Sequence, residues 1–187
     1  MSPPDKVIFL DRDGVINKDP GGWTKYDYVA DWRDFQILPG VFEALKLLKA
    51  NGCKVVIISN QAGVGKGYFT EDGLKAIDQK MRKRIVAHGG DIEASYYCVH
   101  TPEADCGCRK PKTGLFERAG KKLNMDFSGA YFIGDTRRDV EAGRRAGLKT
   151  ILVLTGKASR DEAEAWGEKP DHIFENLLEA VRWLLKY

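Results

Sequence analysis

Short apolar runs recur along the chain, and turn-forming residues bound each of them. Runs of three or four apolar residues bounded in this way predict buried strands of a parallel sheet. They fall at residues 7–10, 55–58, 96–99, 131–133 and 151–154, with a weaker run at 173–174. The pattern therefore predicts five strands and a weaker sixth.

Amphipathic stretches lie between these strands. Apolar residues three or four positions apart predict helices with stripes that begin at Val41, Leu74, Leu115, Val140 and Leu177. Thr70 and Asn176 are expected to cap the second and the last helix, because their side chains accept hydrogen bonds from free backbone N–H groups.

The alternation of strands and helices predicts an α/β fold. We expect a Rossmann-like three-layer sandwich, with a mostly parallel sheet and helices on both faces, formed by residues 1–187 as a single domain. Only 48 positions separate Asp11 from Ser59, and 51 separate Ser59 from Lys110, so no large cap domain is expected. Two long loops, 17–38 and 100–112, are expected to border the functional site.

Polar residues stand at the carboxyl ends of the predicted strands. The first strand runs into Asp11 and Asp13, the second into Ser59 and the fourth into Asp135. Ligands bind beyond this edge of a parallel sheet. Three carboxylates within about 4 Å repel one another by roughly 1 kcal/mol per pair in water. A divalent cation relieves that repulsion, and all-oxygen ligation favours magnesium.

These groups together suit phosphoryl transfer. A carboxylate such as Asp11 attacks phosphorus and forms an acyl-phosphate, which divides hydrolysis into two easier steps. Asp13 is the candidate acid and base, and Ser59 and Lys110 are candidates for holding the phosphoryl oxygens. Asp and Gly at residues 11–14 would also suit a simple turn, but a turn does not explain the polar residues of the other segments.

Four segments in chain order, at residues 9–16, 58–60, 110–111 and 133–136, resemble the motifs of the haloacid dehalogenase superfamily. The resemblance implies an enzyme, a magnesium-dependent phosphatase with Asp11 as nucleophile. It implies that Asp11, Asp135 and the backbone carbonyl of Asp13 bind the magnesium ion. The last motif often carries a second acidic residue. Asp139 is the nearest candidate here, as a ligand, a helix cap or a group behind the ligands.

Three of the four cysteines lie within eleven residues. Cys98, His100, Cys106 and Cys108 form a set that binds zinc tetrahedrally, and closed sites of this kind are structural. A zinc ion would fix the loop at 98–108, which has few apolar residues of its own. Three structural cysteines, or a redox pair at Cys106 and Cys108, are the alternatives.

The zinc loop ends in Cys-Arg-Lys-Pro, and together with residues 11–17, 28–29 and 59–63 it resembles the phosphatases of D-glycero-D-manno-heptose 1,7-bisphosphate. The resemblance implies removal of the 7-phosphate, in the synthesis of nucleotide-activated heptose for bacterial surface glycans such as lipopolysaccharide. It also implies substrate contacts from Asp19, Gly22, Asn60, Gln61, Ala62, Arg109, Lys110 and Thr136. The loop at 19–28 departs from the pattern, which leaves the preferred anomer open.

Composition limits the partners. The net charge of the 187 residues is +3, and no long basic run indicates nucleic-acid binding. No apolar run approaches the ~20 residues of a membrane helix, and the first ten residues lack the pattern of a signal peptide. We therefore expect a cytoplasmic monomer that acts on a small phosphorylated sugar, with no membrane or nucleic-acid partner.

Two other functions fit the same residues. One is the related histidinol-phosphate phosphatase activity, and the other is a non-catalytic, zinc-stabilised module that binds phosphate without releasing any. The glycine-rich segment at 63–67 lacks residues that an ATP-binding P-loop requires. We expect it to form a flap or to line the pocket.

Overall fold

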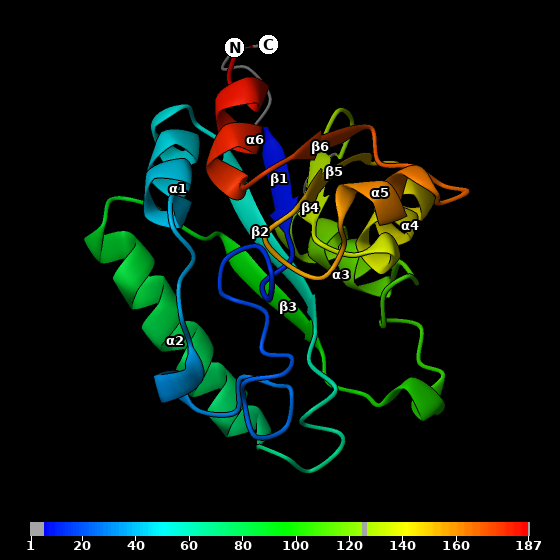
Figure 1. The fold of residues 1–187 in the computed structure, drawn as a ribbon. Helices are drawn as coiled ribbons and strands as arrows, with labels where there is room; N and C mark the ends of the chain where they lie inside the picture. The colour runs from blue at the N-terminus through cyan, green and yellow to red at the C-terminus, as the bar shows by residue number, and fades with distance from the viewer. Residues whose placement is uncertain (1–5, 125–126, 187) are drawn as a thin grey trace.

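The computed structural model describes residues 6–124 and 127–186 of the chain. One sheet of six strands runs through the molecule in the order β3-β2-β1-β4-β5-β6 (Figure 1). Its strands are β1 (Val7–Leu10), β2 (Lys54–Asn60), β3 (Ala94–Cys98), β4 (Tyr131–Gly134), β5 (Lys149–Val153) and β6 (His172–Phe174). Every neighbouring pair is parallel. The predicted strands are confirmed, the weaker sixth included.

Helices cover both faces of this sheet. They are α1 (Val41–Ala50), α2 (Glu71–Ala87), α3 (Gly114–Leu123), α4 (Arg137–Arg145), α5 (Arg160–Glu164) and α6 (Leu177–Leu184), with 3-10 helices η1 (Trp32–Asp34) and η2 (Pro102–Ala104). The apolar residues of α1, α2 and α6 pack on one face, and those of α3 and α4 on the other (Figure 1). This is the predicted three-layer sandwich, and the described residues form no large cap domain.

The pleat of β1 explains why its run is apolar throughout. Ile8 and Leu10 point to the face covered by α1, α2 and α6, whereas Val7 and Phe9 point to the face covered by α3. Phe9 meets Phe116 of α3 edge to face, with ring centroids 5.3 Å apart. Both sides of the strand are therefore buried, as in other parallel sheets.

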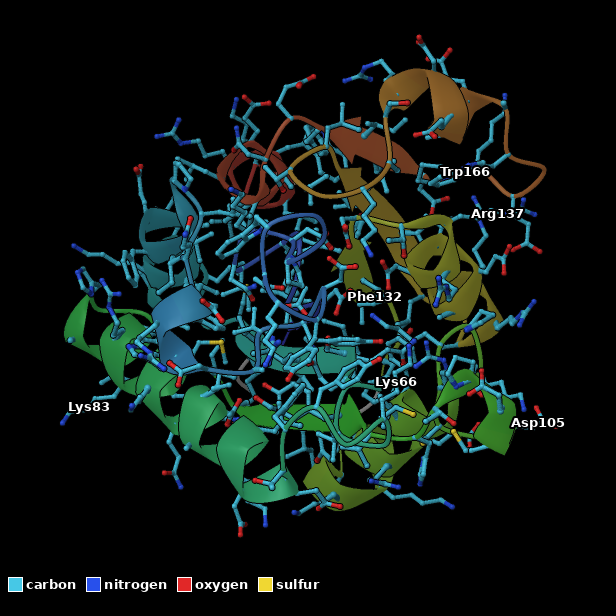
Figure 2. All side chains as sticks on the ribbon, turned by 60° about the horizontal axis from the view of Figure 1, so that its bottom comes forward. Lys66, Lys83, Asp105, Phe132, Arg137 and Trp166 are labelled. Atoms are coloured by element: carbon cyan, nitrogen blue, oxygen red, sulfur yellow. The ribbon has the colours of Figure 1, made fainter. Side chains whose placement is uncertain are left out.

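Charged side chains lie around this core. In Figure 2, Phe132 lies in the interior, while Lys83 and Arg137 project at the periphery. None of the helices in the described part of the chain has the length and apolarity needed to cross a bilayer.

The predicted capping residues of α2 and α6 are confirmed, and one helix of the structure was not predicted. The side chain of Thr70 accepts from Gly73 N, and that of Asn176 accepts from Glu179 N. Helix α5 was not predicted, although its capping box of Ser159 and Glu162 is a sequence signal for a helix start.

The strand order creates a crevice at one edge of the sheet. The chain moves from β1 outward to β2 and β3, and then returns to place β4, β5 and β6 on the other side of β1. Connections from β1 and β4 therefore diverge, and this is where open α/β sheets bind ligands. Asp11 follows β1 directly, Asp135 follows β4, and Asp11 N donates to Ile133 O at 2.9 Å.

Candidate active site

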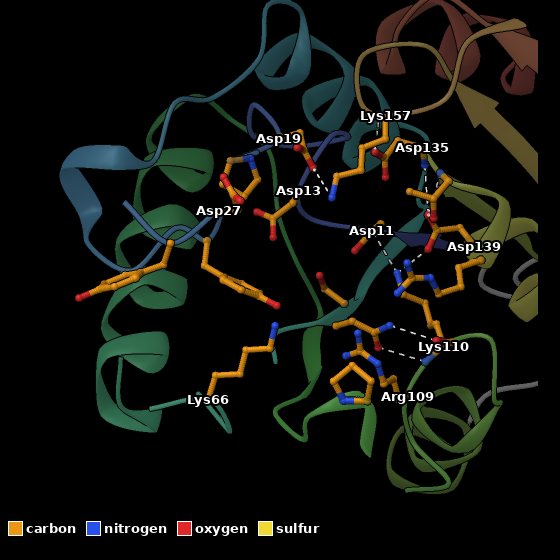
Figure 3. A pocket seen from close by; sticks show the side chains of 18 of the residues that line it. Asp11, Asp13, Asp19, Asp27, Lys66, Arg109, Lys110, Asp135, Asp139 and Lys157 are labelled. Atoms are coloured by element: carbon orange, nitrogen blue, oxygen red, sulfur yellow. Dashed lines mark hydrogen bonds and ion pairs between the residues drawn. The ribbon is translucent and has the colours of Figure 1, made fainter. Parts of the chain in front are cut away.

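Three carboxylates meet in the crevice between β1 and β4 (Figure 3). Asp11, Asp135 and Asp139 each offer one oxygen, and these oxygens lie within 4.8 Å of one another. Asp135 is only 1% exposed, and within the described part of the chain its Oδ1 has no hydrogen-bond partner. Buried carboxylate oxygens with free lone pairs fit a hard divalent cation such as magnesium.

Two glycines allow the backbone to approach Asp135. Gly14 has φ of +83°, and a Cβ atom there would lie 2.3 Å from Asp135 Oδ2. A Cβ atom on Gly156 would lie 1.9 Å from the same oxygen. The hydroxyl of Thr155 donates to Gly14 O at 2.6 Å and joins the two segments. Any larger side chain at either glycine would displace the carboxylate.

The environment disfavours ionised carboxyl groups at this point. Burial raises the pKa of Asp11 to about 6, although the charge of Lys110 opposes the shift. Burial, followed by the charges of Asp139 and Asp11, raises the pKa of Asp135 well above its ordinary value. A bound cation would reverse both effects, because it stabilises the ionised forms.

Lys110 is the cation that the fold itself supplies. Its Nζ lies 3.0 Å from Asp11 Oδ2 and 2.6 Å from Asp139 Oδ1, and it donates to Ile58 O at 3.0 Å. Burial would lower the pKa of Lys110, but Asp11 and Asp139 outweigh burial and raise it. The ammonium group therefore stays charged beside the candidate nucleophile.

Asp139, whose role the sequence left open, makes two kinds of contact. Its Oδ2 accepts from Thr136 N at 3.0 Å and from Thr136 Oγ1 at 2.5 Å, which caps α4. Its Oδ1 pairs with Lys110. The helix cap, one of the three alternatives for Asp139, is present, and the same side chain pairs with Lys110.

The remaining predicted catalytic groups converge on the same point. The Ser59 hydroxyl hydrogen-bonds Asp11, and the side chain of Asp13 is 16% exposed at the cavity. Asn60 accepts from Lys110 N at 3.0 Å and donates to Lys110 O at 3.2 Å. The end of β2 is thereby tied to the loop that carries Lys110.

A cavity of about 530 Å³ opens above these groups. Its acidic end is formed by Asp11, Asp13 and Asp135, beside which Lys110 and Lys157 also line the cavity, and its cationic end is formed by Lys66 and Arg109 on the opposite side (Figure 3). Of the predicted substrate contacts, the lining includes Asp19, Asn60, Arg109, Lys110 and Thr136.

Three predicted substrate contacts do not line the cavity. Gln61 and Ala62 are buried, at 0% and 1% exposure, because their side chains turn into the interior at the end of β2. Gly22 is exposed on the loop at 17–38, which follows β1. These three residues lie outside the lining of the cavity, and their contact with the substrate stays a prediction.

Other lining residues were not predicted individually. Tyr26 and Tyr68 stack with centroids 4.6 Å apart, and the amine of Lys66 lies 5.5 Å from the ring of Tyr28. All four line the cavity, so the glycine-rich segment does contribute to the pocket, as one of the two alternatives expected. The only sequence signal for this side of the cavity was Lys66, which lies between two glycines and is followed by Tyr68.

The cysteine loop forms a compact cluster beside the site. The Sγ atoms of Cys98, Cys106 and Cys108 lie 3.2–3.5 Å apart, and His100 Nδ1 lies 3.3 Å from Cys108 Sγ. In a tetrahedral zinc site the sulfur–sulfur distance is about 3.8 Å. All three cysteines are free thiols, so a formed disulfide does not explain the cluster. The four residues fit a structural zinc ion.

Fold and site together define a phosphatase of the haloacid dehalogenase superfamily. A family model described as HAD-hydrolase-like matches residues 107–180. A curated relative from Haemophilus ducreyi, D-glycero-beta-D-manno-heptose-1,7-bisphosphate 7-phosphatase, is 38% identical over 96% of this chain and 98% of its own length. The relative of the same name from Pasteurella multocida is 40% identical, over 85% and 87%. The chain belongs to the family of these heptose-bisphosphate phosphatases.

Solved structures agree with this assignment. The D,D-heptose 1,7-bisphosphate phosphatase from B. bronchiseptica, complexed with magnesium and phosphate, matches with a TM-score of 0.87 and 33% identity, over 97% of this chain and 98% of that one. The heptose-bisphosphate phosphatase from Burkholderia thailandensis matches with a TM-score of 0.72 and 28% identity, over 98% and 100%. The fold expected from the motifs is therefore confirmed.

Proposed function

We propose that this chain removes the 7-phosphate of D-glycero-β-D-manno-heptose 1,7-bisphosphate, in the synthesis of nucleotide-activated heptose. The observation that carries the proposal is a single cavity with an acidic end at Asp11 and Asp135 and a cationic end at Lys66 and Arg109. A substrate with a phosphate at each end matches that distribution of charge. The relatives named for this activity align over nearly their whole length, and their names give the β anomer.

The proposed chemistry follows from the side chains at the acidic end. Asp11 attacks phosphorus and becomes an aspartyl-phosphate while the sugar oxygen leaves with a proton from Asp13. Water then attacks the acyl-phosphate and gives its proton to Asp13, which releases phosphate and restores Asp11. Ser59 and Lys110 hold the phosphoryl oxygens during both steps. Magnesium bound by Asp11, Asp135 and the backbone carbonyl of Asp13 would neutralise the charge of the phosphate.

The second phosphate is assigned to the cationic end. Arg109 is half-buried, and it lines the cavity. An arginine at a cavity wall suits a phosphate, which accepts two parallel hydrogen bonds. Arg109 directly follows Cys108, so a zinc ion in the cysteine loop would fix its backbone. Histidinol phosphate has no second phosphate and would leave these cations without a partner.

A substrate panel tests the proposal. We expect phosphate release to be fastest from the β anomer of the heptose bisphosphate, slower from the α anomer, and slowest from histidinol phosphate. Asp11→Asn should reduce turnover by at least about 10³-fold, because the amide cannot form the acyl-phosphate. Normal turnover by that variant would contradict the mechanism, and binding of phosphate without any release would favour the non-catalytic module.

The oligomeric state and the organisation as one domain over residues 1–187 remain predictions. Light scattering behind a sizing column and limited proteolysis test them, with a monomer and a protease-resistant core as the expected results.

A further inference from the structure

We propose that Gln61 is a positioning residue for the proposed reaction, one that fixes the acid/base carboxylate of Asp13 relative to the hydroxyl of Ser59. The inference rests on the role given to Asp13 in the proposed function. It assigns Gln61 a place behind the reacting groups, where substrate does not reach.

The contacts of Gln61 use both ends of its amide. Nε2 donates to Asp13 Oδ2 at 2.7 Å and to Ser59 Oγ at 3.3 Å, while Oε1 accepts from Arg12 Nη2 at 3.0 Å. The side chain is fully buried and does not line the cavity. Its donors and acceptor are therefore committed to three protein groups.

Arg12 gives this arrangement a rigid base. Its side chain is 0% exposed, and its guanidinium lies 5.7 Å from the ring centroid of Phe35 and 5.8 Å from that of Tyr97. Nε and Nη2 donate to Asp13 Oδ1 at 3.1 and 3.0 Å, and Nη2 also reaches Asp13 Oδ2 at 3.1 Å. A planar, packed guanidinium holds a carboxylate in one orientation.

Both oxygens of Asp13 accept from Arg12, and each has a second partner of its own. Asn17 Nδ2 joins Arg12 at Oδ1, at 2.8 Å. Gln61 donates the shortest bond to Oδ2. Gln61 also bonds Ser59, so it ties the proton-transfer group to the group that holds the phosphoryl oxygens. Because acid/base catalysis needs hydrogen-bond reach, a shift of about 1 Å costs up to about 100-fold in rate.

The role involves no proton exchange by Gln61 itself. In the first step the proton of Asp13 passes to the sugar oxygen as the bond between phosphorus and that oxygen breaks. In the second step Asp13 takes a proton from the water that attacks the aspartyl-phosphate. The amide of Gln61 only holds Asp13 where both transfers reach.

Leaving-group dependence separates positioning from a structural role. Gln61→Met keeps the length of the side chain and removes its hydrogen bonds, and Gln79→Met, on the exposed face of α2, is the matched control. Under single-turnover conditions we expect release of the sugar from the heptose bisphosphate to slow by roughly 10- to 100-fold. Release of p-nitrophenolate from p-nitrophenyl phosphate needs no acid and should slow less than about 3-fold.

A double-mutant cycle completes the test. In an Asp13→Asn background, Gln61→Met should have no further effect on sugar release, because the group that it positions no longer transfers a proton. Equal slowing with both substrates, or an undiminished effect in that background, would overturn the proposal. If thermal unfolding shows that the Gln61→Met variant is not folded, Gln61→Glu is tested in its place. This variant keeps the acceptor for Arg12 but turns a carboxylate toward Asp13, and full activity there would also overturn the proposal.

The controls keep the two proposals apart. Wild-type protein that releases no phosphate from the heptose bisphosphate would contradict the proposed function. Normal turnover by Asp13→Asn would contradict the role of Asp13. Either result is independent of the comparison between Gln61→Met and Gln79→Met on p-nitrophenyl phosphate.

Discussion

At the residue scale, the site places several carboxyl groups close together at buried positions. Asp11 and Asp135 are buried beside Asp139, and within the described residues Lys110 is the only lysine paired with this group. One ammonium group cannot balance three carboxylates. Burial raises the pKa of Asp11 to about 6 although the charge of Lys110 opposes the shift, and the charge of Asp139 adds to it, so a proton binds Asp11 more readily when no metal ion is bound.

Magnesium affinity should therefore depend on pH. Below pH 6 the Asp11 carboxyl carries a proton that the ion must displace, and above pH 6 it does not, so binding should tighten as pH rises from 5 to 7. For each displaced proton we expect the apparent Kd to fall by about tenfold per pH unit below the pKa and to level off above it. Calorimetry in buffers of different ionisation enthalpy measures both affinity and proton release. Asp11→Asn should release fewer protons, and weaker binding at pH 7 than at pH 5 would contradict the expectation.

At the element scale, the loop between β3 and α3 depends on its sulfur atoms. Cys98 and Cys108 are buried, whereas η2 in the middle of the loop has no buried residue. Burial opposes ionisation of Cys106, but hydrogen bonds with Cys108 and Cys98 outweigh burial and lower its pKa to about 6. A thiolate near neutral pH is the form that binds zinc.

Loss of one ligand should release the zinc ion and loosen this loop. We expect Cys106→Ala to lose about one equivalent of zinc and a few degrees of Tm, because the metal supplies folding free energy to the segment. The KM for the bisphosphate should rise, since Arg109 follows the loop directly. Elemental analysis and thermal unfolding measure the first two effects. Cys53 is a buried cysteine outside the loop, so the Cys53→Ala variant should bind as much zinc as the unsubstituted protein. Unchanged metal content in Cys106→Ala would rule out the zinc site.

At the scale of the whole molecule, the sheet order gives the cavity its two ends. β1 and β4 deliver the acidic groups, while the segment after β2 and the cysteine loop after β3 deliver Lys66 and Arg109. Elements from both halves of the sheet thus face one another across a space of about 530 Å³ (Figure 3). The described residues form no large cap domain, and we expect loops to select the substrate.

Substitution of the charged side chains at the cationic end should weaken the binding of bisphosphates alone. Hydrogen bonds to charged groups contribute about 1.5–3 kcal/mol each, so Arg109→Met and Lys66→Met should each raise KM for the heptose bisphosphate by roughly 10- to 100-fold. KM for a heptose 7-monophosphate should change little. Steady-state kinetics on both substrates provides the measurement, with Lys75→Met on exposed α2 as control. An equal rise for the monophosphate would show that these residues do not bind the second phosphate.

Sequence reasoning succeeded where the local signal was a buried apolar run, although it missed the capping box of α5. A strand buried on both faces must be apolar throughout, so 7–10 and 131–133 were visible as strands. Asp11 was recognised because it follows the first run directly, and Asp135 because only Gly134 separates it from the second. Gln61 was assigned to the substrate from its neighbours in the motif, since a sequence does not show which way a side chain turns at a strand end.

The chain alone therefore determined the strands, most of the helices and the chemical identity of the acidic and sulfur groups, because each depends on residues close together in sequence. Tertiary structure decided which groups meet. The pairing of Lys110 with Asp139, the glycine contacts of Asp135, and the place of Lys66 opposite the carboxylates arise from segments that lie far apart along the chain. The strand order, which brings β4 back beside β1, fixes those meetings.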